Sequence, residues 1–232
     1  MKNKYLVLIA LSILISCGKG TKKETETGLV KAENQPNIVF ILSDDQSWTD
    51  YSFMGDENIE TPRIDQFAKE SLTFTRSYVP TPLCSPSLAT IITGLYPKDH
   101  GIIGNDKVYK RVKGDRSASK KNRAEAYKPV IAAFEKQTTL PDMLKEKGYL
   151  SFQTGKWWHG NHKVGGFDYG MTHGDPKRGG RHGDYGLKIG RTGLDTINNY
   201  VDLALKQKKP FFLWYAPFLP HRPHTPPARL YE

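Results

Sequence analysis

Short apolar runs alternate along the chain with stretches in which apolar positions recur every three or four residues. The continuous runs occupy residues 37–42, 149–152 and 211–215. Runs of this length are typical of strands buried in a parallel sheet. The helical spacing occupies residues 62–72, 138–147 and 192–207. Because strands and helices alternate, the pattern predicts an α/β fold with a mostly parallel sheet flanked by helices.

Start and stop signals bound the predicted helices. Thr61 and Pro62 suit the N-cap and first position of one helix, and Gly148 suits the end of another. A further helix is expected between Pro86 and Gly94, which places Cys84 at its N-terminus. The dipole and free amides of such a terminus stabilise anions. Taken alone, however, this cysteine is more simply interpreted as a core residue.

Polar side chains follow each of the three predicted strands. Asp44 and Asp45 come after the first, Lys156 after the second and His221 after the third. The carboxyl ends of parallel strands meet at one edge of the sheet, and open α/β sheets bind their ligands there. We therefore expect these four residues to converge.

Composition narrows the class of protein. Of 232 residues, 38% are hydrophobic and 25% charged, which excludes disorder and a polytopic membrane protein. The net charge of +10 is concentrated in residues 107–123 and in the glycine-rich residues 165–190, which include Lys177, Arg178 and Arg181. Both segments are predicted to be loops near the site. They contain no helix-turn-helix, finger or RNP pattern, so nucleic acid is disfavoured, and a solvated surface without a partner is the alternative.

The N-terminus carries a targeting pattern. Lys2 and Lys4 precede a largely apolar run over residues 5–16, which predicts a signal peptide over residues 1–16. The run is shorter than the roughly 20 residues that cross a bilayer. Residues 14–17 (Leu-Ile-Ser-Cys) resemble a bacterial lipobox, so residues 17–35 are predicted to be a flexible tether lipidated at Cys17, which holds the protein at the bacterial cell envelope. A signal peptide that ends near a free cysteine is the alternative.

Several segments carry a family resemblance together. They are residues 36–45, Thr61-Pro62 with Asp65, residues 84–87 (Cys-Ser-Pro-Ser), residues 93–97, Gly155-Lys156-Trp157, residues 210–212 and Pro220-His221. In this order and spacing the chain resembles the type I, formylglycine-dependent sulfatases of the alkaline phosphatase superfamily. The resemblance implies that residues 36–232 are the N-terminal part of a sulfatase catalytic domain, with the alkaline phosphatase/sulfatase-like fold incomplete at the C-terminus.

The resemblance also implies roles for individual residues. Asp44 and Asp45 would be ligands of one Ca²⁺ ion, together with the side chain of Cys84. A maturation enzyme would oxidise Cys84 to formylglycine, whose hydrate attacks the sulfur of the substrate. Lys156 would bind a sulfate oxygen, and His221 would protonate the leaving alkoxide as a general acid.

Two positions depart from the family's pattern. The family often has Gly-Lys-Trp-His, whereas here a second tryptophan, Trp158, displaces the histidine to His159. The catalytic role of that histidine falls to His159, to His162, or to neither. The family's formylglycine signature usually has arginine four residues after the cysteine, and this chain has Leu88.

Three functions are consistent with these residues. The leading hypothesis is a sulfuric ester hydrolase that removes sulfate from a sulfated sugar or polysaccharide. A phosphodiesterase or phosphonate hydrolase of the same superfamily is the alternative within catalysis, because a metal-plus-nucleophile site discriminates sulfate from phosphate poorly. The third hypothesis is a non-catalytic lipoprotein that binds sulfated glycans through its basic segments.

Overall fold

The structure is a computed structural model, and it describes residues 35–105, 113–174, 184–224, 226 and 228. The predicted signal peptide, Cys17 and nearly all of the predicted tether lie outside the described residues. So do Lys177, Arg178 and Arg181 of the glycine-rich segment. Within the described part of the chain, no helix combines the length and the apolarity that crossing a membrane requires.

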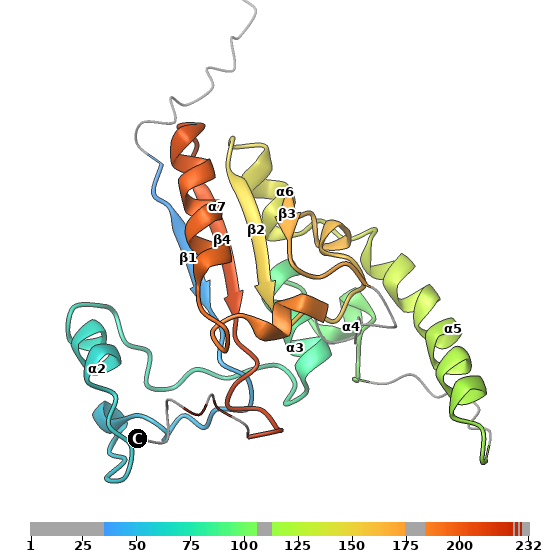
Figure 1. Cartoon of the computed structure of the whole chain (residues 1–232), viewed down its shortest axis with the longest axis horizontal. Helices are drawn as coiled ribbons and strands as arrows, with labels where there is room; N and C mark the ends of the chain where they lie inside the picture. Colours follow the sequence, from blue (N-terminus) through green and yellow to red (C-terminus); the bar gives the residue numbers. More distant parts are fainter. Residues whose placement is uncertain (1–34, 106–112, 175–183, 225, 227, 229–232) are drawn as a thin grey trace, which may run out of the picture. The chain divides into compact units, whose positions relative to one another are not determined.

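Four strands form one parallel sheet (Figure 1). They are β1 (Ile38–Ile41), β2 (Leu150–Gly155), β3 (Tyr169–Gly170) and β4 (Phe211–Ala216). Their order in the sheet is β1-β4-β2-β3, and every neighbouring pair is parallel. The three strands predicted from apolar runs and their parallel arrangement are confirmed. The two-residue β3 is too short to leave a signal in the sequence.

The central strand β4 carries the core on both of its faces. Phe212 and Trp214 point into one hydrophobic cluster, while Phe211 and Leu213 point into a second. Successive side chains of a strand point to opposite faces of a sheet, so a strand covered on both sides needs apolar residues at every position. This explains why β4 is a continuous apolar run rather than an alternating one.

Helices cover both faces of the sheet. They are α2 (Pro62–Lys69), α3 (Cys84–Thr93), α4 (Pro97–His100), α5 (Arg116–Phe134), α6 (Leu140–Lys145) and α7 (Asp195–Lys206), with 3-10 turns η2 (Ser52–Met54), η3 (His162–Gly165) and η5 (Asp184–Lys188). Side chains of α3, α5 and α6 join the first cluster, and side chains of α7 join the second. The helices predicted over residues 62–72, 138–147 and 192–207 are confirmed, with shorter bounds.

The helix α2 differs from the prediction in length and in burial. It ends at Lys69 rather than near Leu72, and none of its residues is buried. Ile64 and Phe67, which give the segment its helical spacing, are exposed in the structure. The spacing therefore identified the helix but not a buried face.

The prediction that residues 107–123 form a loop is wrong for residues 116–123, which belong to α5. The first half of α5 has no apolar stripe, so periodicity gave no signal, but it is rich in Arg, Lys and Ala, which favour helices intrinsically. The Asp115 side chain caps the helix by accepting a hydrogen bond from the Ala118 N–H at 2.9 Å. Tyr127 and Phe134 in the second half are buried in the first cluster.

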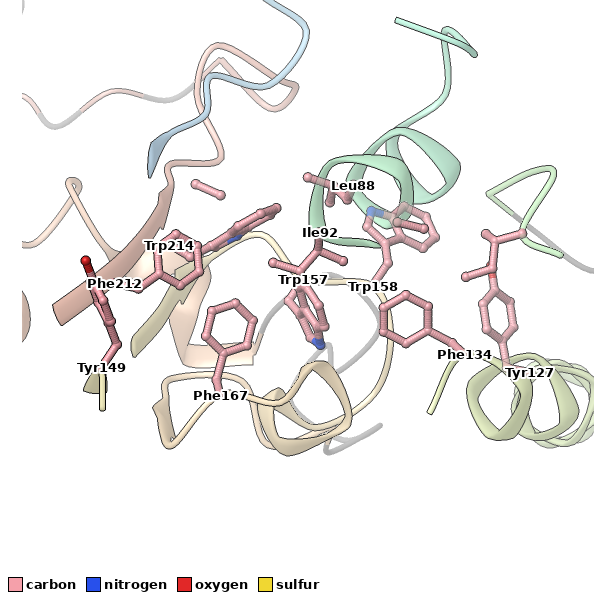
Figure 2. Packing of buried hydrophobic residues seen from close by; sticks show 13 residues of the cluster. Leu88, Ile92, Tyr127, Phe134, Tyr149, Trp157, Trp158, Phe167, Phe212 and Trp214 are labelled. Carbon is pink, nitrogen blue, oxygen red and sulfur yellow. The ribbon is translucent and has the colours of Figure 1, made fainter. Parts of the chain in front are cut away.

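Aromatic side chains dominate this first cluster (Figure 2). Trp157 makes edge-to-face contacts with Phe134, Phe167 and Trp214, with ring centroids 5.5–6.0 Å apart. His159 belongs to the same packing, because its ring stacks on that of Phe134 at a centroid distance of 4.2 Å. Burial, and to a smaller extent nearby His100, lowers the pKa of His159 to about 3.

Gly155 is the last residue of β2 and directly precedes Lys156. Gly155 has φ +76°, and a Cβ atom there would lie 1.8 Å from the carbonyl oxygen of Ala216. The next amide, that of Lys156, donates a hydrogen bond to the same oxygen at 2.7 Å. Only glycine permits both this backbone conformation and this approach, so the direction of Lys156 depends on it.

We expect Gly155→Ala to lower the free energy of unfolding by several kcal/mol, because the methyl group would overlap the β4 backbone. The matched control is Gly148→Ala, where φ is +83° and no atom lies within 4 Å of the added Cβ. That change should cost only about 1–2 kcal/mol of conformational strain. Urea unfolding of the two variants measures the difference, and equal losses would contradict the close approach at Gly155.

The buried His159 predicts a dependence of stability on pH. Its pKa is about 3 in the folded chain against 6.5 in the unfolded chain, so the unfolded chain takes up the proton first as the pH falls. Stability is therefore lost from about pH 6.5 downwards, on the order of 2 kcal/mol by pH 5. We expect His159→Gln to lose less stability than the unsubstituted protein between pH 7 and pH 5.

Urea unfolding at the two pH values measures this effect, and His224→Gln is the control because His224 is exposed. His100 and His162 also have pKa values lowered by burial, so part of the acid sensitivity remains in the His159 variant. An identical loss of stability in His159→Gln and the unsubstituted protein would refute the buried neutral histidine.

Candidate active site

The site lies where β1, β4 and β2 end. Beyond the strands, the Leu42 N–H donates to the Tyr215 carbonyl at 2.9 Å, and the Asp44 N–H lies 3.5 Å from the Leu219 carbonyl. Asp44 and Pro220 also form an isolated parallel bridge. The pairing of β1 with β4 thus continues past the strand ends and holds the two loops together at this edge, as the sequence predicted.

A buried ion pair forms the centre of the site. The Lys156 ammonium contacts Asp44 Oδ2, and the Lys156 side chain is only 2% exposed. A buried charge of this kind needs an opposite charge and hydrogen bonds, because its separation from water is costly. Asp44 therefore neutralises Lys156 and, through the pair, links the end of β1 to the end of β2.

Asp44 also faces the cysteine. Its Oδ1 atom lies 3.8 Å from Cys84 Sγ. The helix α3 begins at Cys84, two residues before the predicted Pro86, and ends at Thr93, with Gly94 (φ +70°) as its C-cap, so Cys84 is at the helix N-terminus as predicted. The Asn105 side chain accepts a hydrogen bond from the Ser85 N–H at 2.9 Å. Asn105 was not predicted, because nothing in a loop residue 20 positions further along the chain signals this contact.

Asp45 and His221 form the outer side of the site. Asp45 is exposed and has φ +58°, a left-handed conformation that aspartate tolerates better than most residues. His221 Nε2 lies 3.6 Å from Asp45 Oδ2, and its Nδ1 lies 2.6 Å from the Arg222 carbonyl oxygen. The two ring nitrogens thus face a carbonyl oxygen and a carboxylate oxygen, and imidazole is a group that can donate a proton to a leaving oxygen.

The donor set of this site fits a hard metal ion. Ligand atoms of Asp44, Asp45 and Cys84 all lie within 4.8 Å of one another. Two carboxylates are the ligands that Ca²⁺ and Mg²⁺ prefer, whereas Zn²⁺ prefers histidine and thiolate. The two carboxylates could therefore hold an oxygen-preferring divalent cation, with the side chain of residue 84 beside it.

The structure brings together five of the six residues predicted for the site. They are Asp44, Asp45, Cys84, Lys156 and His221. The sixth, His159, lies instead in the aromatic cluster, and its catalytic role stays a prediction. His162 is also buried, and its Nδ1 lies 2.9 Å from the Thr172 carbonyl oxygen. This polar contact is made within its own segment, residues 159–173.

Leu88 lies in the first hydrophobic cluster, one turn of α3 beyond Cys84 (Figure 2). Its side chain is buried with those of Ile92 and Trp158 in the same cluster. The position at which the resembled family usually has arginine is thus an apolar core position in this chain.

Comparison with known proteins agrees with this geometry. A family model described as Sulfatase matches residues 36–232. A protein named Sulfatase from Formosa agariphila is 34% identical over 170 residues, which are 73% of this chain and 30% of that protein. An N-acetylglucosamine-6-O-sulfatase from Bacteroides thetaiotaomicron is 30% identical over 240 residues, which are 97% of this chain and 36% of that protein.

One solved structure is similar to this chain in three dimensions. It is the structure of a protein in complex with its substrate, D-glucosamine-2-N,6-O-disulfate. The two align with a TM-score of 0.56 and 26% sequence identity, over 84% of this chain and 36% of that chain. This chain thus spans about a third of the length of the proteins it matches. Because the family model covers most of the sequence and the fold agrees, the chain belongs to the sulfatase family.

Proposed function

We propose that this chain forms the N-terminal part of the catalytic domain of a sulfuric ester hydrolase, which removes sulfate from a sulfated sugar or polysaccharide. The observation that carries the proposal is the convergence of Cys84, two carboxylates, a buried lysine and a histidine at one edge of the sheet. The named activity of the N-acetylglucosamine-6-O-sulfatase and the disulfated glucosamine bound in the solved structure support this substrate class.

Cys84 is proposed to act after a maturation enzyme has oxidised it to formylglycine. As a hydrate, that group supplies a nucleophilic oxygen and a second hydroxyl that permits the elimination of sulfate. A plain thiol would supply no such exit. The position at the start of α3 supports the proposal, because the helix dipole favours negative charge there.

Asp44 and Asp45 are proposed to hold one Ca²⁺ ion together with the oxidised side chain of residue 84. When bound, the ion would neutralise the sulfate and polarise the nucleophile. Asp44 would then divide its two oxygens between the ion and Lys156, since Oδ1 faces Cys84 and Oδ2 faces the ammonium.

Lys156 and His221 are proposed to act on opposite ends of the bond that breaks. Lys156 would contact a sulfate oxygen as a point charge, sharing its ammonium between that oxygen and Asp44 Oδ2. As the bond from sulfur to the alcohol oxygen breaks, His221 would donate its Nε2 proton to that oxygen. Negative charge that develops in the transition state would thus be stabilised at the sulfate by Lys156 and at the alcohol oxygen by His221.

We expect protein from its native host to carry formylglycine at residue 84 and to hydrolyse sulfate esters in a chelator-sensitive reaction. Cys84→Ala should lower kcat by at least about 1,000-fold, because a nucleophile is lost. Mass spectrometry of the peptide that contains residue 84 detects the oxidation, and parallel assays with matched sulfate and phosphate esters measure the activity. Asp44→Asn should lower both metal binding and kcat.

The outcomes separate the three hypotheses. Unmodified Cys84 together with activity that survives Cys84→Ala would defeat the mechanism. Faster hydrolysis of the phosphate ester would favour the phosphodiesterase or phosphonate hydrolase. A protein with unmodified Cys84 that is inactive but binds sulfated glycans would favour the third hypothesis, the non-catalytic glycan-binding lipoprotein.

We also propose that Cys17 is lipidated and that the protein is anchored at the bacterial cell envelope. The support is the charged start, the apolar run and the Leu-Ile-Ser-Cys sequence of residues 14–17. We expect Cys17→Ser to move the protein from the membrane to the soluble fraction, as measured by fractionation and immunoblotting. Cys84→Ser, which leaves the lipobox intact, is the matched control. A Cys17→Ser protein that still sediments with membranes would refute the lipid anchor.

A further inference from the structure

One aromatic ring, that of Phe218, lies beside both Lys156 and His221. Phe218 follows β4 by two residues, and its side chain is 9% exposed. The Lys156 ammonium lies 5.1 Å from the centroid of its ring, and the centroids of the Phe218 and His221 rings are 4.4 Å apart. No signal in the sequence distinguishes Phe218 from the other aromatic residues near β4.

The ring has a physical reason to hold Lys156. Lysine has a flexible four-carbon side chain, and the contact with Asp44 fixes only its charged end. The face of an aromatic ring attracts a cation, more strongly where water is excluded. With Lys156 only 2% exposed, the ring of Phe218 at 5.1 Å and the more distant ring of Trp158 at 6.0 Å restrict where the ammonium can lie without competing for its hydrogen bonds.

The same ring limits the freedom of His221. The polar contacts of His221 are with the carbonyl of the adjacent Arg222 and, at 3.6 Å, with exposed Asp45. Neither Asp45 nor Arg222 lies in a helix or a strand. The ring of Phe218, tilted by 38° against the imidazole, packs against His221 and links it to the buried part of the site.

Phe218 is itself held in place by the sheet. The carbonyl of Leu219, the next residue, lies 3.5 Å from the Asp44 N–H, and β4 immediately before it pairs with both β1 and β2. A movement of Phe218 would therefore disturb the pairing of the strand ends. The ring is anchored to the element that also positions Asp44.

We propose that Phe218 is a positioning residue that fixes the separation between the Lys156 ammonium and the His221 imidazole. The proposal rests on the proposed function, because it assumes that these two groups act at opposite ends of one sulfate ester. It assigns Phe218 no contact with the substrate. An aromatic ring is the feature required, so tyrosine should replace phenylalanine and leucine should not.

The test compares Phe218→Leu with Phe218→Tyr in the full chain. Phe152→Leu is the matched control, because Phe152 is also a buried, stacked phenylalanine, 6% exposed, but belongs to the second hydrophobic cluster. We expect Phe218→Leu to lower kcat about tenfold, which is within the range of a desolvated cation–π contact. Phe218→Tyr should retain kcat within about twofold, and Phe152→Leu should lower stability while leaving kcat unchanged.

Nuclear magnetic resonance gives a readout that needs no turnover. In the unsubstituted protein, protons of the Lys156 side chain and of the His221 ring should be displaced upfield by the Phe218 ring current. In Phe218→Leu the displacement of the His221 ring protons should vanish and that of the Lys156 protons should shrink, because the Trp158 ring, 6.0 Å from the ammonium, remains. Both displacements should persist in Phe218→Tyr and Phe152→Leu.

Absence of the displacement in the unsubstituted protein would overturn the positioning role, whatever the activity. Equal losses of kcat in Phe218→Leu and Phe152→Leu would overturn it as well, since they would reveal a general effect of stability. A displacement that Phe218→Leu abolishes, in a protein that hydrolyses no sulfate ester, would support the arrangement and reject the proposed function instead.

Discussion

The site depends on one buried ion pair, between Asp44 and Lys156. Each residue follows a different strand, and the two strands are not neighbours, because β4 lies between them. Either charge alone would be uncompensated in a water-poor environment. The pair is therefore stable only when β1, β4 and β2 have assembled in register, and the same assembly brings His221 beside Asp45. Electrostatics and strand order thus impose the same arrangement.

Much of this arrangement could be predicted from the sequence, because two simple regularities apply. Continuous apolar runs identify strands buried on both faces, and polar residues directly after them mark the carboxyl edge of a parallel sheet. These regularities located Asp44, Asp45, Lys156 and His221. Contacts made by packing could not be predicted in this way: Phe218 and Asn105 make contacts with neighbours that only the folded chain supplies, and the ring of His159 stacks on Phe134 in the aromatic cluster.

The first half of α5 shows where such regularities fail. The charge of residues 116–123 suggested a loop, yet intrinsic helix propensity and the Asp115 cap form a helix there without an apolar stripe. Membership of the sulfatase family rests on the match over residues 36–232, whereas the proposed chemistry rests on a few side chains at one edge of the sheet, because a fold by itself does not determine a reaction. Leu88 is an example. It packs into the core one turn beyond Cys84, at the position where the resembled family usually has arginine, so the fold is kept while a side chain near the site differs.

The place of β4 in the sheet has a consequence for the synthesis of the protein. The strand is the last of the four to leave the ribosome, yet it lies between β1 and β2 and makes the ladder hydrogen bonds to both. More than a hundred residues separate β1 from β2 along the chain, and contacts of such long sequence separation form slowly. Until residue 216 has emerged, the nascent chain has no completed sheet edge, and α3 presents Cys84 without its folded surroundings.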